Sequence, residues 1–119
     1  MKYICLIYSS EVEDAKMSPE EQQADFAAYM DYNQIIEKAG ISTNLGEALQ
    51  PTATATTVRI RDGKTVASDG PFAETKEQLG GFYILDCKDL DQAIEYAAMI
   101  PAAKHGSVEV RPILEINFD

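Results

Sequence analysis

The chain has 119 residues, 45% of them hydrophobic and 25% charged, which predicts one globular domain spanning residues 1–119. Twenty acidic residues against ten Lys and Arg give a net charge of −10, which argues against nucleic acid and against an anionic membrane surface as partners. The first apolar run, residues 3–8, is too short for a signal sequence or a membrane span, so we expect a cytoplasmic protein.

Cysteine and histidine are scarce in this sequence. Cys5 and Cys87 lie in apolar runs, where buried free thiols are more common than a disulfide. There is no Cys-X-X-Cys motif, and a single histidine, His105, excludes a multi-histidine metal centre. We therefore expect no metal and no cofactor. His105 is expected at the surface, because the sequence identifies no partner that would orient it.

The first third of the chain predicts a strand followed by a long helix. Residues 2–8 form a β-branched and aromatic run typical of a central strand, and the polar residues 9–17 are expected to be a loop. Ser18-Pro19-Glu20-Glu21 predicts a helix start with a capping box, and the helix is expected to run to Ala39. Its apolar positions are Phe26, Tyr29, Met30, Ile36 and Ala39.

The middle of the chain predicts a weaker strand and then a hairpin. Residues 41–49 form the weaker strand, which is interrupted by a glycine. Residues 54–61 alternate between apolar and polar side chains, and the Asp62-Gly63 pair that follows is the preferred two-residue type I′ turn. Residues 64–68 are then the returning strand.

The remaining elements complete an α+β fold. Residues 81–87 predict an apolar strand, residues 89–100 a helix capped by Asp89, and residues 107–118 a last strand. This order is a split βαβ pattern, which predicts a ferredoxin-like sandwich with an inserted β-hairpin. Both helices should then cover one face of an antiparallel sheet. The other face carries apolar side chains that are costly to leave in water, so we predict a two-fold homodimer in which two sheets pack together.

The segment DGPFAETKEQLGG, residues 69–81, is expected to be an elaborate loop before a core strand. Asp69 begins a turn. Phe72 is interpreted either as a plug in the mouth of a barrel or as an aromatic wall of a ligand site, and we favour the plug. Lys76 is either part of a solvated ion-pair cluster or a handle for an anion, and the ion pair is favoured. Gly80-Gly81 is expected to permit a close backbone approach or a bulge.

Three further residues are candidate ligand contacts. Arg111 lies in the last strand, on the face expected to meet the partner, and needs either a carboxylate or an anionic ligand there; the ion pair with a residue such as Glu109 is favoured. Asn33 lies near the apolar side of the first helix and either caps a loop carbonyl or lines a cleft between helix and sheet. Tyr29 could donate a hydrogen bond in that cleft.

The string DGPFAETKEQLGGFYIL, with QPTATATTVRIRDGK before it and VEVRPI near the C-terminus, resembles the DGPF branch of the YCII-related domain family. The resemblance implies a dimeric α/β barrel. Members of the wider family carry a His in the first helix and an Asp after the second, which are suspected of catalysis. This sequence has neither residue at those places. Some similar proteins occur beside or fused to sigma factors, which implies a regulatory role.

Two functions are compatible with these observations. The first is a small-molecule-binding or regulatory module with a site in the barrel cavity, for which a small anionic ligand is one candidate. The alternative is an enzyme that uses residues such as Asp69, Tyr29 and Arg111 for acid–base work on a small anionic metabolite. The missing His–Asp dyad favours the first.

Overall fold

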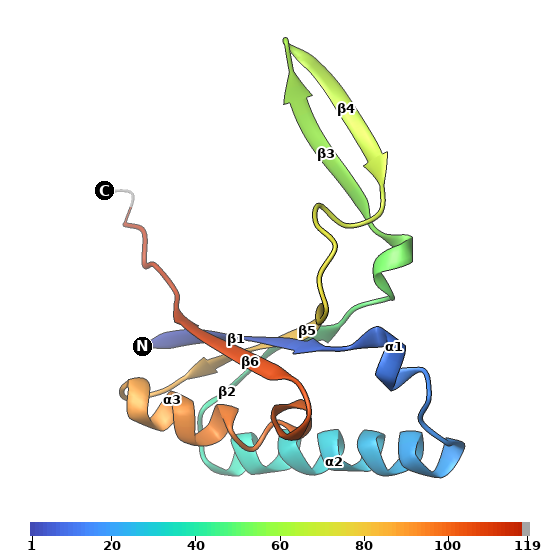
Figure 1. Cartoon of the computed structure of the whole chain (residues 1–119). Coiled ribbons are helices and arrows are strands. Elements are labelled where there is room, and N and C mark those ends of the chain that lie inside the picture. The colour runs from blue at the N-terminus through green and yellow to red at the C-terminus, as the bar shows by residue number, and fades with distance from the viewer. Residues whose placement is uncertain (118–119) are drawn as a thin grey trace.

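The computed structural model describes residues 1–117 and shows a four-stranded antiparallel sheet, helices on one of its faces, and a separate hairpin (Figure 1). Phe118, the end of the expected last strand, lies outside the described residues. The sheet order is β2-β5-β1-β6, and the described residues form no closed barrel within one chain. The elements are β1 (Lys2–Ser9), α1 (Glu11–Asp14), α2 (Pro19–Lys38), β2 (Ser42–Ala48), the 3-10 helix η1 (Thr52–Thr54), β3 (Thr56–Arg61), β4 (Lys64–Asp69), β5 (Gln78–Asp86), α3 (Leu90–Ala97), the 3-10 helix η2 (Pro101–Lys104) and β6 (Ser107–Pro112).

The core lies between the sheet and the helices α2 and α3. Strand β1 is central, as its sequence predicts, and pairs with β5 on one side and β6 on the other. Its alternate residues Tyr3, Cys5 and Ile7 are buried because they face the helical layer. Both cysteines are buried free thiols, as expected. The buried hydrophobic residues are Tyr3, Cys5, Ile7, Tyr32, Ile36, Ile41, Leu85, Cys87, Ala93, Ala97, Ile100 and Ala102.

Helix α2 begins where its capping box predicts. The Ser18 hydroxyl accepts from the Glu21 amide, and the Glu21 carboxylate accepts from the Ser18 amide. The predicted apolar positions are only partly buried, however: Ile36 faces the core, whereas Phe26 is 69% exposed and Met30 is also exposed. Only the C-terminal half of α2 therefore packs against the sheet, and its N-terminal half borders an open cleft.

The expected loop at residues 9–17 contains a short helix, α1, so this prediction was wrong. The Ser10 side chain caps it, and Glu11 ties it to the segment after β2. The Glu11 carboxylate accepts from the Thr52 amide at 2.8 Å and from its hydroxyl at 2.6 Å, while the Glu11 amide donates to the Gln78 side chain. These partners lie far away in sequence, which is why the local pattern does not reveal the helix.

The second half of the chain contains the predicted helix and strands, but these elements begin or end at other residues than predicted. Asp89 caps α3 as expected, but the helix ends at Ala97 and a 3-10 turn begins at Pro101. Strand β5 begins three residues earlier than predicted, at Gln78. Strand β6 ends at Pro112, and Leu114 beyond it is 80% exposed rather than facing the core. The sequence thus predicts α2, α3 and the strands of the sheet, whereas it misses α1 and several of the boundaries.

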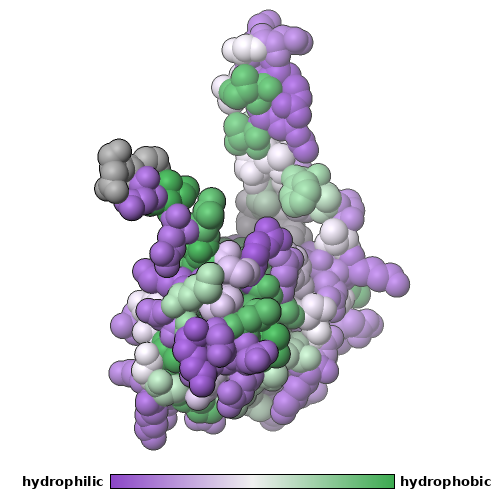
Figure 2. All heavy atoms as spheres, turned by 90° about the vertical axis from the view of Figure 1, so that its left-hand side faces the viewer, coloured by the Kyte–Doolittle hydropathy of each residue, from purple (hydrophilic) through white to green (hydrophobic). Residues whose placement is uncertain are grey.

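The β3–β4 hairpin stands away from the body of the molecule (Figures 1 and 2). Its turn residues Asp62 and Gly63 have φ values of 52° and 74°, as the predicted type I′ turn requires. Every residue of β4 is exposed. The hairpin therefore adds nothing to the core of its own chain, and we call it the arm, residues 56–69.

The sheet face opposite the helices is covered by no described helix (Figure 1). The cross-strand pairs Ile4–Ile84 and Leu6–Phe82 lie on this open face, because their neighbours Tyr3, Cys5 and Leu85 point into the core. All four side chains are half-buried. The arm and the C-terminal segment both rise on the same side of the sheet (Figure 1).

Candidate functional site

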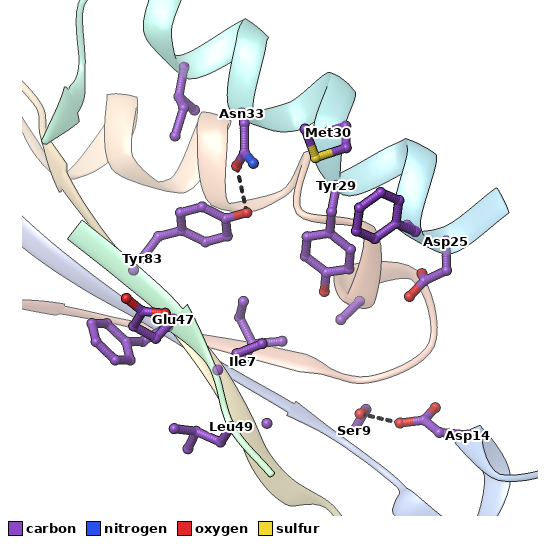
Figure 3. Close-up of a pocket in the computed structure, with 18 of the residues that line it drawn as sticks. Ile7, Ser9, Asp14, Asp25, Tyr29, Met30, Asn33, Glu47, Leu49 and Tyr83 are labelled. Atoms are coloured by element: carbon purple, nitrogen blue, oxygen red, sulfur yellow. Dashed lines mark hydrogen bonds between the residues drawn. The ribbon is translucent and has the colours of Figure 1, made fainter. Parts of the chain in front are cut away.

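A cleft of about 840 Å³ lies between helix α2 and the edge of the sheet formed by β2 and β5 (Figure 3). It reaches from Glu37 near the end of α2 to His105 before β6, and continues around the edge strand β2. Its volume is in the range of sites for small organic ligands. Residues along most of α2, from Gln22 to Glu37, line the cleft.

Both walls of the cleft carry large apolar side chains that are exposed to solvent. Phe26 and Met30 of α2 line it and are exposed, and Leu45 and Leu49 of the β2 segment line it as well. Large apolar side chains that border a concave surface provide contact area for a ligand, which then removes them from water. Phe26 and Met30 belong to the apolar positions predicted for the first helix, and they line this cleft instead of the core.

A tyrosine–asparagine hydrogen bond joins the two walls. The Tyr83 hydroxyl of β5 donates to the Asn33 side-chain oxygen of α2 at 2.8 Å (Figure 3). Burial raises the pKa of Tyr83, so this hydroxyl stays protonated at neutral pH. Asn33 therefore lines a cleft between helix and sheet, which was one of its two interpretations. Its amide group keeps donors that this hydrogen bond does not use.

Tyr29 points into the same cleft from α2 (Figure 3). Burial, together with the nearby Asp25 carboxylate, raises the pKa of Tyr29 to about 12. A phenol with this pKa is neutral at physiological pH and acts as a hydrogen-bond donor or acceptor rather than as a base. The role of a neutral hydrogen-bonding group, foreseen as one use of Tyr29, fits this environment.

Asp14, Ser9 and His105 meet at one end of the cleft. The Ser9 hydroxyl donates to one Asp14 carboxylate oxygen at 2.6 Å (Figure 3), and the His105 Nε2 lies 3.9 Å from the other. The His105 and Asp14 side chains are 51% and 38% exposed, so both are accessible to a ligand. His105 is a surface residue, as expected, but the carboxylate gives it the partner that the sequence did not identify.

The charge of the cleft is negative. Among the described residues that line it, none is Lys or Arg, and His105 is the one basic side chain. A lining of this kind favours neutral or cationic ligands over anions. The lining carboxylates belong to Glu11, Asp14, Asp25, Glu37 and Glu47.

The six predicted site residues fall into two separate groups. Tyr29 and Asn33 line the cleft, whereas Asp69, Phe72, Lys76 and Arg111 do not. Phe72 is 81% exposed in the loop after the arm, and Asp69 and Lys76 are exposed as well. Arg111 lies on the open face and pairs with Glu109, which is the ion pair that its sequence context favoured.

Sequence reasoning missed Tyr83, Asp14 and Ser9 as site residues. Tyr83 belongs to a strand that is otherwise apolar, so its sequence context did not suggest a site residue. In the structure its hydroxyl is the hydrogen-bond partner of Asn33 in the cleft. Asp14 and Ser9 lie in the segment that the sequence predicts to be a loop. A serine and an aspartate five positions apart at the end of a strand were the available signal, and it is too common to be informative.

Residues 1–117 lack two further features. This part of the chain holds no group of three or more His, Cys, Asp or Glu arranged to bind a metal ion. None of its helices is both long enough and apolar enough to cross a membrane. The 20-residue helix α2, for example, carries five acidic residues.

Comparison with known proteins identifies relatives of this chain. The model of the YCII-related domain matches residues 1–117. An uncharacterised protein of Rhizobium meliloti (strain 1021) is 41% identical over 117 residues, an alignment that covers 95% of this chain and 92% of that protein. Both matches extend over nearly the whole sequence, including every residue of the cleft. The chain therefore belongs to the YCII-related domain family.

Proposed function

We propose that this protein is a small-molecule-binding module whose ligand occupies the cleft between α2 and the β2–β5 edge. The observation that carries the proposal is the combination of exposed Phe26 and Met30 with the hydrogen-bonding groups Asn33, Tyr83 and Tyr29 in one concavity. Apolar walls with a few converging polar groups are typical of ligand sites.

The cleft also restricts the chemistry of the ligand. With five carboxylates and one imidazole along its lining, it suits a neutral or cationic compound that can donate hydrogen bonds. The small anion that the sequence led us to consider would need Lys76 or Arg111, and neither lines this cleft. A sigma-factor connection and membership of the DGPF branch stay predictions of the resemblance.

Thermal-shift screening of a metabolite library tests the proposal, because a ligand that binds the folded state raises the melting temperature. Asn33→Ala is expected to abolish the shift produced by neutral or cationic hits. Gln34→Ala is the matched control, since Gln34 is exposed on the same helix and does not line the cleft. The proposal would be contradicted if both variants lost the thermal shift equally. It would also be contradicted if all compounds that bind were anions.

A second candidate function is acid–base catalysis at the same cleft. It is favoured by the Asp14 carboxylate, which lies between the Ser9 hydroxyl and the His105 imidazole. A bound substrate could lose a proton to Asp14, and protonated His105 could return one to the product. If this hypothesis is right, Asp14→Asn and His105→Gln should still show the thermal shift caused by a bound compound. They should no longer convert that compound, as measured by NMR of the reaction mixture.

We further propose that the protein is a homodimer with ferredoxin-like subunits. The order β2-β5-β1-β6, with α2 and α3 on one face, is consistent with a split βαβ topology. The open face carries Ile4, Leu6, Phe82 and Ile84, and a second sheet packed about 10 Å away would remove them from water. Sedimentation velocity at micromolar concentration tests this, and a monomer would contradict it.

A further inference from the structure

The arm places unpaired cations at the far end of a projection. The chain has only ten Lys and Arg, yet Arg59, Arg61 and Lys64 lie within six residues of one another. Arg61 and Lys64 are directly opposite each other across the hairpin, and Arg59 is on the same side. Within residues 1–117, none of the three forms an ion pair.

This arrangement is unfavourable in an isolated chain. Like charges directly opposite each other in a hairpin repel, and no carboxylate on the same side offsets them. The other side of the arm carries Val58 and Ile60, which are 61% and 60% exposed. An exposed hairpin with one cationic and one apolar side has the composition of a contact surface.

The base of the arm is closed by hydrogen bonds between its own ends, and the segment before it is bound to the body. The Thr57 hydroxyl donates to the Gly70 carbonyl at 2.9 Å, and the Gly70 amide donates to the Ala55 carbonyl at 2.7 Å. Below these bonds, Thr52 is bound by the Glu11 carboxylate. The arm leaves the body on the side of the open face (Figure 1).

The arm is long enough to extend past the partner's sheet in the proposed dimer. Six residues per strand extend about 20 Å at about 3.3 Å per residue. In the proposed dimer, the partner's sheet would lie about 10 Å above the open face and its helical layer about 10 Å beyond that sheet. The tip of the arm therefore reaches the level of the partner's helices.

That helical layer is acidic, whichever edge of the partner the arm passes. Its α-helices include one basic residue, Lys38. Their carboxylates are Glu11, Glu13, Asp14, Glu20, Glu21, Asp25, Asp31, Glu37, Asp91 and Glu95. The surface that the arm can reach is thus opposite in charge to Arg59, Arg61 and Lys64.

We propose that the arm is a clasp whose cationic side docks on the acidic helical layer of a second copy of this chain. The inference rests on the homodimer proposed above. It also brings the arm of one copy to the layer that forms one wall of the partner's cleft, so each cleft would be bordered by both subunits. A nucleic acid is the other occupant that a cationic hairpin could take, and the net charge of −10 disfavours it.

Charge reversal of the arm tests the clasp. R59E/R61E/K64E is expected to raise the dimer dissociation constant about tenfold or more, as measured by sedimentation. The control is K16E/K76E/K88E, which changes the net charge equally but lies outside both the arm and the α-helices on which the arm is proposed to dock, and it should weaken the dimer less. Raising the salt from about 0.1 M to about 1 M, which shortens the Debye length from about 10 Å to about 3 Å, should weaken the wild type and hardly affect the arm variant.

Carbodiimide cross-linking of a mixture of ¹⁴N- and ¹⁵N-labelled protein locates the contact. Lys64, the one lysine of the arm, should link to carboxylates of α1, α2 or α3 in peptides of mixed isotope, and Lys64→Arg should abolish these links. Peptides that contain only one isotope would overturn the proposal.

Three other results would overturn the clasp. If V58S/I60S weakens the dimer and R59E/R61E/K64E leaves it unchanged, the arm docks through its apolar side instead. Binding of a DNA duplex that is lost in R59E/R61E/K64E assigns the cations to nucleic acid. A wild-type monomer removes the clasp and the dimer together. Ligand binding in the cleft is tested separately, by the thermal shift of Asn33→Ala. A failure of the proposed function can therefore be told apart from a failure of the clasp.

Discussion

The rings of Tyr32 and Tyr83 lie edge to face, with centroids 5.1 Å apart and planes inclined by 68°, but their hydroxyls differ in hydrogen bonding. Tyr83 donates to Asn33 at the cleft. Tyr32 is 1% exposed, and its hydroxyl has no hydrogen-bond partner among residues 1–117. One tyrosine therefore satisfies its polar atom, and the other buries it at a cost.

The two tyrosines should respond in opposite directions to loss of the hydroxyl. Tyr32→Phe is expected to raise the free energy of unfolding by about 1 kcal/mol, because it removes an unsatisfied buried group. Tyr83→Phe should lower it by about 0.5–1.5 kcal/mol through loss of the bond to Asn33. Urea denaturation measures both. A loss of stability in Tyr32→Phe would show that its hydroxyl has a partner, such as a buried water.

Gly81 and Gly80 form a second matched pair. A Cβ added at Gly81 would lie 2.8 Å from the Glu47 backbone oxygen, whereas one at Gly80 meets nothing within 4 Å. Gly81→Ala should therefore push β2 away from β5 and destabilise by about 1–3 kcal/mol. Gly80→Ala should remain within about 0.5 kcal/mol of the wild type. Equal effects in denaturation experiments would mean that the edge strand moves freely.

The same glycines show what sequence can and cannot predict. A close approach or a bulge was expected at Gly80-Gly81, and the structure has both: Gly81 abuts Glu47, and the β1–β5 register shifts between Ile7 and Tyr8. Local signals of this kind, including the Ser18 capping box and the Asp62-Gly63 turn, depend on neighbouring residues and are readable from the chain.

The candidate site depended on contacts that no local pattern encodes. Asp14 meets His105 because β1 pairs with β6, which places Tyr8 opposite Ser107. The segment after β1, which contains Asp14, therefore lies beside the segment before β6, which contains His105. Asn33 meets Tyr83 only through the packing of α2 on β5. Glu11 likewise binds Thr52, which lies 41 residues further along the chain, just before the arm. Sequence reasoning therefore found Tyr29 and Asn33 but not their partners.

The capping box of α2 gives a prediction that depends on pH. Ser18→Ala should destabilise by about 1 kcal/mol, and Ser18→Asp, which keeps an acceptor, by much less. The hydrogen bonds with Ser18 lower the pKa of Glu21 below its value of 4.5 in an unfolded chain. The contribution of Glu21 is therefore complete above about pH 4.5 and is lost as the pH falls through the lower, folded value. Denaturation at pH 7 and pH 3 should show a smaller Glu21→Gln effect at pH 3, because protonated Glu21 has lost the charge that strengthens its hydrogen bond with the Ser18 amide, and an unchanged effect would contradict this.

Buried thiols and phenols predict a loss of stability in alkali. Burial raises the pKa of Cys5 from 9.0 to about 11, and also raises the pKa of Cys87. Burial raises the pKa values of Tyr29 and Tyr32 above 10.0 as well. Since the unfolded chain releases these protons first, the free energy of unfolding is highest below pH 9 and falls as the pH rises toward 11.

Urea denaturation between pH 7 and pH 11 measures this fall and can separate its sources. In Cys5→Ala/Cys87→Ala the decline should begin near pH 10 rather than pH 9, because only the phenols then titrate. Adding Tyr32→Phe should make the remaining slope shallower. The slope is compared rather than the absolute stability, because removing buried sulfur atoms also leaves cavities. A wild-type stability that stays constant up to pH 11 would mean that the thiols and phenols titrate alike in the folded and unfolded chains.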